Sequence, residues 1–157
     1  MFNHAASDYK CPFCLLVHRL SDGNNDEHDI IFQNKHATAL ISAKWWVNNP
    51  GHAFIIPNQH YENLYEIPDE DLAEVYKVVK QVAIAMRKTY NCEGTSTRQH
   101  NEPSGNQHVW HMHVHVFPRY KDDELYSNHN NCRFTNHNER QPYAEMLRKH
   151  LAEQHLS

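Results

Sequence analysis

Short apolar runs bounded by turn-forming residues recur along the chain and predict β-strands. The first two runs flank Asn34-Lys35, a dipeptide that suits a tight hairpin. A later run ends at Pro57, because proline cannot donate a hydrogen bond to a neighbouring strand. Residues 43–51, which contain two tryptophans, are expected to form a loop. The predicted strands cover residues 29–33, 36–42, 52–57, 94–100 and 109–118.

One long segment has helical rather than strand periodicity. Apolar side chains recur every three or four residues over 69–90, which predicts an amphipathic helix with Asp69 as its N-cap. We expect the resulting apolar stripe to pack on a sheet. The stripe consists of Leu72, Val75, Tyr76, Val79, Val82, Ala83 and Met86. A second helix is predicted over 141–155, and a short helical turn over 61–67.

These elements together predict an α+β fold. We expect an antiparallel sheet of about five strands with the 69–90 helix packed on one face. Residues 121–140 are rich in Asn and His and lack any period, so we interpret them as a surface excursion. No internal repeat or linker divides the 157 residues, a length that fits one domain.

Composition excludes several classes of protein. The chain has 15 Lys and Arg against 19 Asp and Glu, a net charge of −4 with neutral histidines, and it has no basic run. This balance argues against a nucleic-acid partner. Its four glycines lie at least 11 positions apart, so the glycine-rich loops of Rossmann enzymes, P-loop NTPases and α/β-hydrolases are absent.

The N-terminal segment indicates a compartment. It is polar and has no signal-peptide core, and no apolar run reaches the roughly 20 residues of a membrane span. We therefore expect a cytoplasmic protein without membrane partners. In the cytoplasm thiols stay reduced, so Cys11-Pro12-Phe13-Cys14 is interpreted as a metal-binding or redox motif, not as a structural disulfide.

The most informative segment carries three of the chain's 15 histidines. If residues 109–118 form a strand, His111, His113 and His115 share one face, with neighbours about 6.6 Å apart. The opposite face then carries Met112, Val114 and Val116, which suit a core. Two functions fit such a row: three ligands of a metal ion, or an imidazole that attacks phosphorus while its neighbours bind the phosphoryl oxygens. Spacing alone does not choose between them.

Three motifs resemble one known family. Residues 107–119, QHVWHMHVHVFPR, resemble the signature of the histidine triad (HIT) superfamily of nucleotide hydrolases and transferases. Residues 51–60, GHAFIIPNQH, resemble the strand that precedes it in that family. Residues 11–14 resemble the C-x-x-C of its zinc-bearing members. The motifs occur in the order typical of the family and span residues 11–119.

The resemblance implies a catalytic set. His113 would be the nucleophile that attacks the α-phosphorus and forms a nucleotidyl-histidine, with a backbone carbonyl fixing its tautomer. His115 would hydrogen-bond phosphate oxygens, and Gln107 would assist on the phosphate or leaving-group side. His111 completes the triad. The implied substrates are small-molecule nucleotides such as dinucleoside polyphosphates or adenosine phosphoramidates.

The same resemblance suggests residues on the substrate side. His52 would support the triad, and Asn101 is a candidate contact. Two positions depart from the family pattern: His108 stands where Ser or Thr is common, and Ser42 where many relatives have Asp or Asn for the ribose. The departures leave the phosphate chemistry in place, but they weaken inferences about the base and the leaving group.

A structural zinc ion is also implied. In zinc-bearing relatives the C-x-x-C joins two histidines, which here gives Cys11, Cys14, His60 and His111. Four protein ligands close the coordination sphere, so the ion would anchor the N-terminus and would not perform the chemistry. The alternative is that the cysteines are buried thiols and His60 is a surface residue.

Several alternatives stay open at this point. The chain could instead be a non-enzymatic nucleotide-binding scaffold dimer, or a hydrolase whose triad binds a catalytic metal. The family resemblance implies a homodimer, with residues 1–120 as the catalytic domain and 121–157 packed on it. Four basic residues could bind the distal phosphates of a larger substrate, or simply lie on a solvated loop. They are Arg119, Lys121, Arg133 and Arg140.

Overall fold

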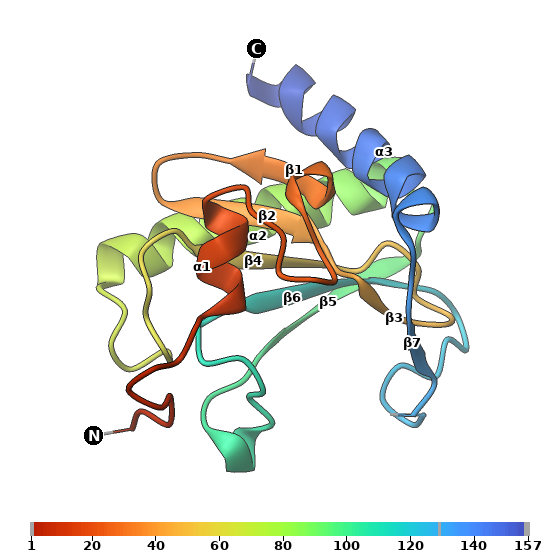
Figure 1. Cartoon of the computed structure of the whole chain (residues 1–157). Coiled ribbons are helices and arrows are strands. Elements are labelled where there is room, and N and C mark those ends of the chain that lie inside the picture. The colour runs from red at the N-terminus through yellow and green to blue at the C-terminus, as the bar shows by residue number, and fades with distance from the viewer. Residues whose placement is uncertain (1, 129, 156–157) are drawn as a thin grey trace.

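The computed structural model describes residues 2–128 and 130–155 and has α+β architecture (Figure 1). Its centre is a five-stranded antiparallel sheet in the order β1-β2-β4-β6-β5. The strands are β1 (Ile30–Gln33), β2 (Ala37–Ile41), β4 (Ala53–Pro57), β5 (Gly94–Gln99) and β6 (Val114–Arg119). The predicted fold class is therefore confirmed, and the hairpin around Asn34-Lys35 joins β1 to β2 as expected.

Alternation along β4 explains how the sheet is covered. Ala53 and Ile55 face helix α2 (Asp69–Thr89) in the larger core, whereas Phe54 and Ile56 face helix α1 (Pro12–Val17) on the other side. Side chains alternate between the faces of a strand, so one apolar run serves both layers. The short α1 covers only part of its face (Figure 1). The rest of that face is where His115 of β6 lies, opposite Phe54 of β4.

Helix α2 matches its prediction in extent but differs at its cap and along its stripe. Pro68 occupies the N-cap position, and Asp69 is instead the first of three acidic residues in the first turn. These negative charges lie at the positive end of the helix dipole and stabilise the helix there. Tyr76 is 44% exposed, a correction to the predicted stripe. The buried positions are Val75, Val78, Val79, Val82, Ala85 and Met86.

The histidine segment is less regular than predicted. β6 begins at Val114, so the expected strand over 109–118 is wrong in its first half. The backbone N–H of Met112 bonds to the carbonyl of Tyr61, and this contact replaces a ladder hydrogen bond. Met112, Val114 and Val116 still lie in the core beneath α2, as their apolar character predicts.

Residues 43–51 and 121–140 are not simple loops. β3 (Lys44–Trp46) and β7 (Cys132–Phe134) pair as an antiparallel two-stranded sheet at one end of the main sheet (Figure 1). The surface excursion predicted for 121–140 is therefore corrected at β7. Three-residue strands are too short to show periodicity, and their pairing joins segments nearly 90 positions apart.

The last helix, α3 (His137–His155), begins four residues before its predicted start and packs on α2 and β1. Asn136 and Glu139 cap it reciprocally, since each side chain accepts from the other's backbone N–H. Residues 61–67 form turns, not the predicted helical turn. Two short 3₁₀ helices complete the fold, η1 (Glu27–Asp29) and η2 (Pro103–Gly105). Among the described residues, no helix has the length and apolar character to cross a membrane.

Candidate active site and metal centre

Two cysteines and two histidines from distant segments converge on one point. The ligand atoms of Cys11, Cys14, His60 and His111 all lie within 4.8 Å of one another. The Nδ1 of His111 is 3.3 Å from the Cys11 sulfur and 3.6 Å from the Cys14 sulfur, and His60 Nδ1 is 3.3 Å from Cys14. In a tetrahedral zinc site with two sulfur and two nitrogen ligands, such edges are about 3.6 Å long. The predicted set is thus brought together with spacing that fits zinc.

The surroundings of His111 prepare it as a ligand. Its Nε2 lies 3.0 Å from the carbonyl oxygen of Pro57, and a carbonyl can only accept, so Nε2 carries the proton. Nδ1 therefore carries a free lone pair that points at the cysteines. A metal-binding imidazole usually has this arrangement, with its other nitrogen hydrogen-bonded. Burial and the adjacent Cys11 thiol raise the pKa of Cys14 to about 12, so the Cys14 thiol ionises readily only beside a cation.

Helix α1 links this cluster to the next histidine of the triad. Cys11 caps the helix, and Cys14 lies in its first turn. Between them, Phe13 stacks on Phe54 of the sheet and meets the His113 ring edge-on at 5.1 Å. The two residues inside the C-x-x-C thus start the helix and support the triad.

His113 has the tautomer that a nucleophile needs. Its Nδ1 lies 2.7 Å from the carbonyl oxygen of His111, so Nδ1 carries the proton and Nε2 a free electron pair. Burial lowers the pKa of His113 to about 4, despite the hydrogen bond to that carbonyl. The ring is therefore neutral at pH 7. The predicted backbone acceptor is confirmed, and it comes from the preceding triad histidine.

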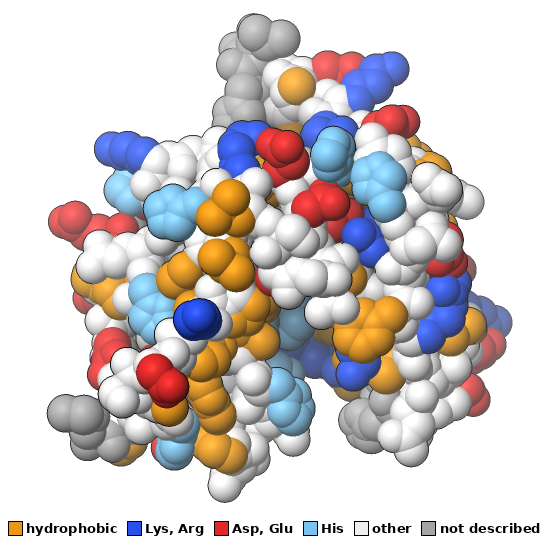
Figure 2. Space-filling model, in the orientation of Figure 1, with side chains coloured by type: hydrophobic (Ala, Val, Ile, Leu, Met, Phe, Trp, Pro, Cys, Tyr) orange, Lys and Arg blue, Asp and Glu red, His pale blue; other side chains and the backbone are white. Residues whose placement is uncertain are grey.

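His115 and His52 form a hydrogen-bonded pair beside His113. His52 Nδ1 lies 3.1 Å from the Lys44 carbonyl, and its Nε2 lies 2.9 Å from His115 Nδ1. The carbonyl must accept, so His52 donates from Nδ1 and accepts from His115, which leaves a lone pair on His115 Nε2. Burial is the main cause that lowers the pKa of His52 to about 3 and that of His115 well below its usual value. Figure 2 shows histidine surface in a hollow of this face.

Other predicted site residues make mostly local contacts. Gln107 is buried. Its side-chain amide donates to the backbone carbonyls of Glu62 and Val109 and accepts from the backbone N–H of Glu102. Asn101 accepts from the Leu64 backbone and pairs with the Gln99 amide. The Ser42 hydroxyl closes a turn with Lys44, and His108 is exposed. Their roles toward a substrate remain predictions.

Two further basic residues near the triad were missed. Arg98 is the direct partner of His115 in the β5–β6 ladder, and such partners share one face of the sheet. Two residues on, the His100 ring lies 6.2 Å from that of His115 and donates from Nδ1 to the Gly105 carbonyl. The sequence alone does not indicate that these two residues lie near the triad, because their position depends on the register of β5 against β6.

Three of the four basic residues considered for distal phosphates are held in ion pairs. Arg119 binds Asp123, Arg133 binds Glu139, and Arg140 binds Asp29. The Arg140–Asp29 pair is almost fully buried, at 5% and 1% side-chain exposure. Lys121 is exposed.

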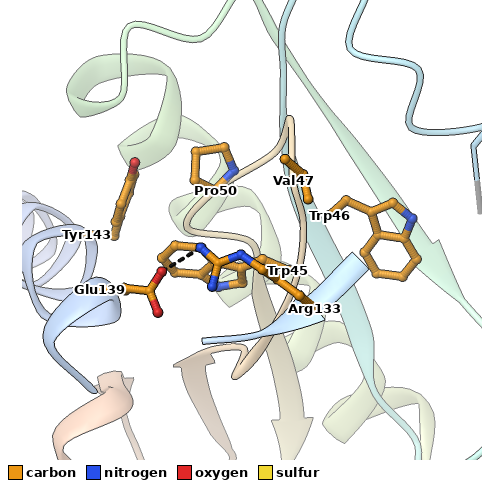
Figure 3. A pocket seen from close by; sticks show the side chains of 7 residues that line it. All are labelled: Trp45, Trp46, Val47, Pro50, Arg133, Glu139 and Tyr143. Atoms are coloured by element: carbon orange, nitrogen blue, oxygen red, sulfur yellow. Dashed lines mark hydrogen bonds and ion pairs between the residues drawn. The ribbon is translucent and has the colours of Figure 1, made fainter. Parts of the chain in front are cut away.

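A separate cavity of about 300 Å³ lies beside β3 (Figure 3). Trp45 lies behind the Arg133–Glu139 ion pair there, whereas the Trp46 ring points away from the other lining residues. Trp46 instead contacts His52 and Phe117 on the triad face. The lining contains no triad residue. It consists of Trp45, Trp46, Val47, Pro50, Arg133, Glu139 and Tyr143.

The α+β sheet, with closely spaced histidines on and just before its internal strand β6, defines a histidine triad protein, and the chain belongs to the HIT family. The HIT domain matches residues 24–122. The adenosine 5′-monophosphoramidase HNT1 of Saccharomyces cerevisiae is 40% identical over 116 residues, which cover 73% of this chain and 66% of that protein. The protein hit of Bacillus subtilis is 31% identical over 110 residues, covering 70% and 71%.

Solved structures share the fold. A Hit-like protein from Bartonella henselae superposes with a TM-score of 0.76 at 25% identity, covering 92% of this chain and 98% of that one. A zinc-bound histidine triad protein from Mycobacterium smegmatis gives the same TM-score at 24% identity, covering 94% and 96%. A diadenosine triphosphate hydrolase from Plasmodium falciparum gives 0.72 at 14% identity, covering 98% and 90%.

Proposed function

We propose that the chain is a nucleotide hydrolase or nucleotidyl transferase that cleaves a phosphoanhydride or phosphoramidate bond at the α-phosphate. The observation that carries this proposal is the 2.7 Å contact from His113 Nδ1 to the His111 carbonyl, which leaves Nε2 unprotonated. A neutral imidazole with a fixed tautomer needs no further activation to attack phosphorus. The yeast relative named as an adenosine 5′-monophosphoramidase supports the choice of substrate class.

The reaction has two half-steps. In the first, the Nε2 electron pair of His113 forms a bond to the α-phosphorus, and the bond to the leaving group breaks with its electron pair. In the second, water or another acceptor attacks the phosphorus, the phosphorus–nitrogen bond breaks, and His113 regains its lone pair. Dividing one displacement into two lowers each barrier.

The His52–His115 pair accounts for the protons. The neutral pair presents a lone pair on His115 Nε2, which can take a proton from the attacking water. His115 can donate to a phosphoryl oxygen or to the leaving group in the first half-step only if it is already protonated, with a proton taken from solvent or from the water consumed in the preceding turnover. A bound phosphate favours this form, because a nearby negative charge raises the pKa of an imidazole. Burial of His52 keeps it neutral and preserves the direction of the chain to the Lys44 carbonyl.

A structural zinc ion held by Cys11, Cys14, His60 and His111 is part of the proposal. The spacing of the four ligand atoms and the proton on His111 Nε2 support it. When bound, the ion would neutralise the two thiolates and fix α1 against the triad. Thiolate ligands require reduced cysteines, which fits the expected cytoplasmic location. The chemistry itself stays with His113 and His115.

The same geometry disfavours a catalytic metal held by the triad. His111 Nδ1 faces the cysteines, His113 Nδ1 the His111 carbonyl, and His115 Nδ1 the ring of His52. Within residues 2–128 and 130–155, the metal-binding cluster includes His111 without the other two. A scaffold that binds nucleotides without turnover remains the second candidate, since the same groups would bind a phosphate.

Turnover and a trapped intermediate test the proposal. The full chain is incubated with adenosine 5′-phosphoramidate and with diadenosine triphosphate, and AMP release is followed by chromatography. A rapid alkaline quench and peptide mass spectrometry should find one adenylyl group on His113. His113→Ala should lower the rate by about 10³-fold or more, whereas His18→Ala, which removes an exposed histidine, should not. Nucleotide binding without turnover would favour the scaffold.

The assembly is proposed on family resemblance alone. We infer a homodimer in which residues 121–157 belong to the same folding unit as residues 1–120. Light scattering after size exclusion tests the dimer directly.

A further inference from the structure

Arg98 is a basic group on the triad face that the proposed chemistry does not use. Its place opposite His115 in the β5–β6 ladder puts it on the same face of the sheet as that histidine, which is proposed to contact the phosphate. In the part of the chain that the structure describes, no carboxylate pairs with Arg98. Arg119, Arg133 and Arg140 each bind one.

Aromatic rings hold the Arg98 side chain in place. Its guanidinium carbon lies 4.8 Å from the centre of the Phe117 ring, 4.7 Å from Tyr126 and 5.7 Å from Trp46. Rings that stack on a guanidinium leave its N–H edge open and reduce the entropy lost on binding. One N–H group, on Nη2, bonds to the Leu125 carbonyl at 3.2 Å. The Tyr126 side chain also interacts with Arg98. An arginine has five such donors, so others of them can bind a ligand.

The neighbouring Arg119 shows the contrast. Its guanidinium also lies over Tyr126, at 4.7 Å, but two of its nitrogens bind the Asp123 carboxylate and a third binds Ser96. The charge of Arg119 is compensated, and each of its three nitrogens already donates a hydrogen bond. Both arginines stabilise the segment around Tyr126, but only Arg98 keeps an uncompensated charge beside the triad.

We propose that Arg98 forms an anion subsite for the leaving group, so that the preferred substrates are those in which the α-phosphate is joined to a further phosphate chain. This inference rests on the proposed function and names its substrate class. In this proposal the leaving group extends from His113 past His115 toward Arg98, the ladder partner of His115. A guanidinium can bind phosphate in a bidentate manner. A neutral amine leaving group, as in a phosphoramidate, gains nothing from this charge.

Two substrates with the same adenylyl group and different leaving groups test the subsite. The kcat/KM of the full chain is measured with diadenosine triphosphate and with adenosine 5′-phosphoramidate, for the parent protein, Arg98→Met and Arg98→Lys. Arg98→Met should lower kcat/KM for the triphosphate by about 10- to 100-fold, the usual size of a lost charged hydrogen bond. The phosphoramidate should change by less than about threefold. Arg98→Lys, which keeps the charge but not the bidentate geometry, should recover part of the loss.

The outcomes separate this inference from a purely structural role. If Arg98 only stabilises the segment around Tyr126, Arg98→Met lowers both activities equally and the melting temperature with them, and the inference is wrong. A loss that Arg98→Lys does not recover would likewise contradict a role for the charge. Unchanged kinetics with the triphosphate would also overturn it.

A binding measurement keeps the inference testable even if the chain proves to have no turnover. Calorimetric titration compares AMP with α,β-methylene-ADP, an analogue that resists cleavage and carries one more phosphate. The parent protein should bind the analogue about tenfold more tightly than AMP, and Arg98→Met should abolish that difference. Equal affinities in the parent protein would refute the subsite, while absent turnover alone would refute only the proposed function.

Discussion

The ring of Phe13 meets the ring of His113 almost at a right angle, with their centres 5.1 Å apart and an interplanar angle of 86°. Phe13 lies between the two cysteines of the proposed zinc site. The metal cluster and the proposed nucleophile are therefore joined through one side chain of α1. Any change that moves α1 relative to the sheet should also move His113, whose position determines the rate.

Phe13→Ala tests this connection. We expect kcat to fall by about 10- to 100-fold, because small displacements of a nucleophile are costly, and stability to fall by about 3–5 kcal/mol. Leu16→Ala is the matched control. Leu16 is fully buried in the same apolar cluster, so its loss should cost about 2–5 kcal/mol while kcat changes little. Steady-state kinetics measures kcat, and urea unfolding measures stability, for both variants. Equal losses of kcat in Phe13→Ala and Leu16→Ala would contradict a connection through Phe13.

Metal removal separates a structural from a catalytic ion. Metal analysis of protein purified without chelator should find about one zinc per chain, and Cys14→Ser should lose most of it. The variant should melt at a lower temperature, because binding energy at a structural zinc site is folding energy. Activity should fall in parallel with the loss of structure around α1. A chelator that abolishes activity while the melting temperature stays constant would instead indicate a catalytic metal.

The sequence was most informative where local chemistry is dense. The alternation of histidine with apolar residues from His111 to Val116 correctly placed Met112, Val114 and Val116 in the core. It also predicted the three histidines on the opposite face, where the rings of His111 and His113 both meet Phe13. The alternation alone did not reveal that His111 is turned to the cysteines, because that orientation depends on Pro57 and α1, which are distant in the sequence. The family resemblance did predict that His111 joins the cysteines.

Long-range pairing limited the rest of the prediction. Trp45 and Arg133 are partners in the β3–β7 ladder, yet nothing near either residue signals a strand. Arg98 looked like an ordinary polar strand residue until its register placed it opposite His115. The arginines that attracted attention instead proved to be held by nearby acids, such as Asp123 four residues after Arg119. The charge of an arginine does not indicate a function unless it is known whether a nearby carboxylate neutralises it.

The buried Arg140–Asp29 pair should test whether α3 belongs to the same folding unit as the sheet. Arg140 also bonds to the Thr135 and Asn24 carbonyls, so it ties α3 to the segment before β1. Arg140→Met should lower the free energy of unfolding by about 3–5 kcal/mol, since Asp29 is left buried without its partner. Urea unfolding followed by fluorescence and by circular dichroism should still show one shared transition. Two separate transitions would mean that residues 121–157 fold independently.

Acid should destabilise the protein through His52, which is almost fully buried. Burial lowers its pKa to about 3, whereas an unfolded histidine titrates near about 6.5. Between these values the unfolded chain binds the extra proton, so the free energy of unfolding is constant above this window and falls as pH drops through it. From pH 7 to pH 5 the loss due to His52 is about 2 kcal/mol.

His52→Asn tests this assignment, because asparagine cannot titrate but can still donate to the Lys44 carbonyl. Urea unfolding at pH 7, 6 and 5 should therefore give the variant a shallower pH dependence by about this amount, and parallel curves for the two proteins would contradict the assignment.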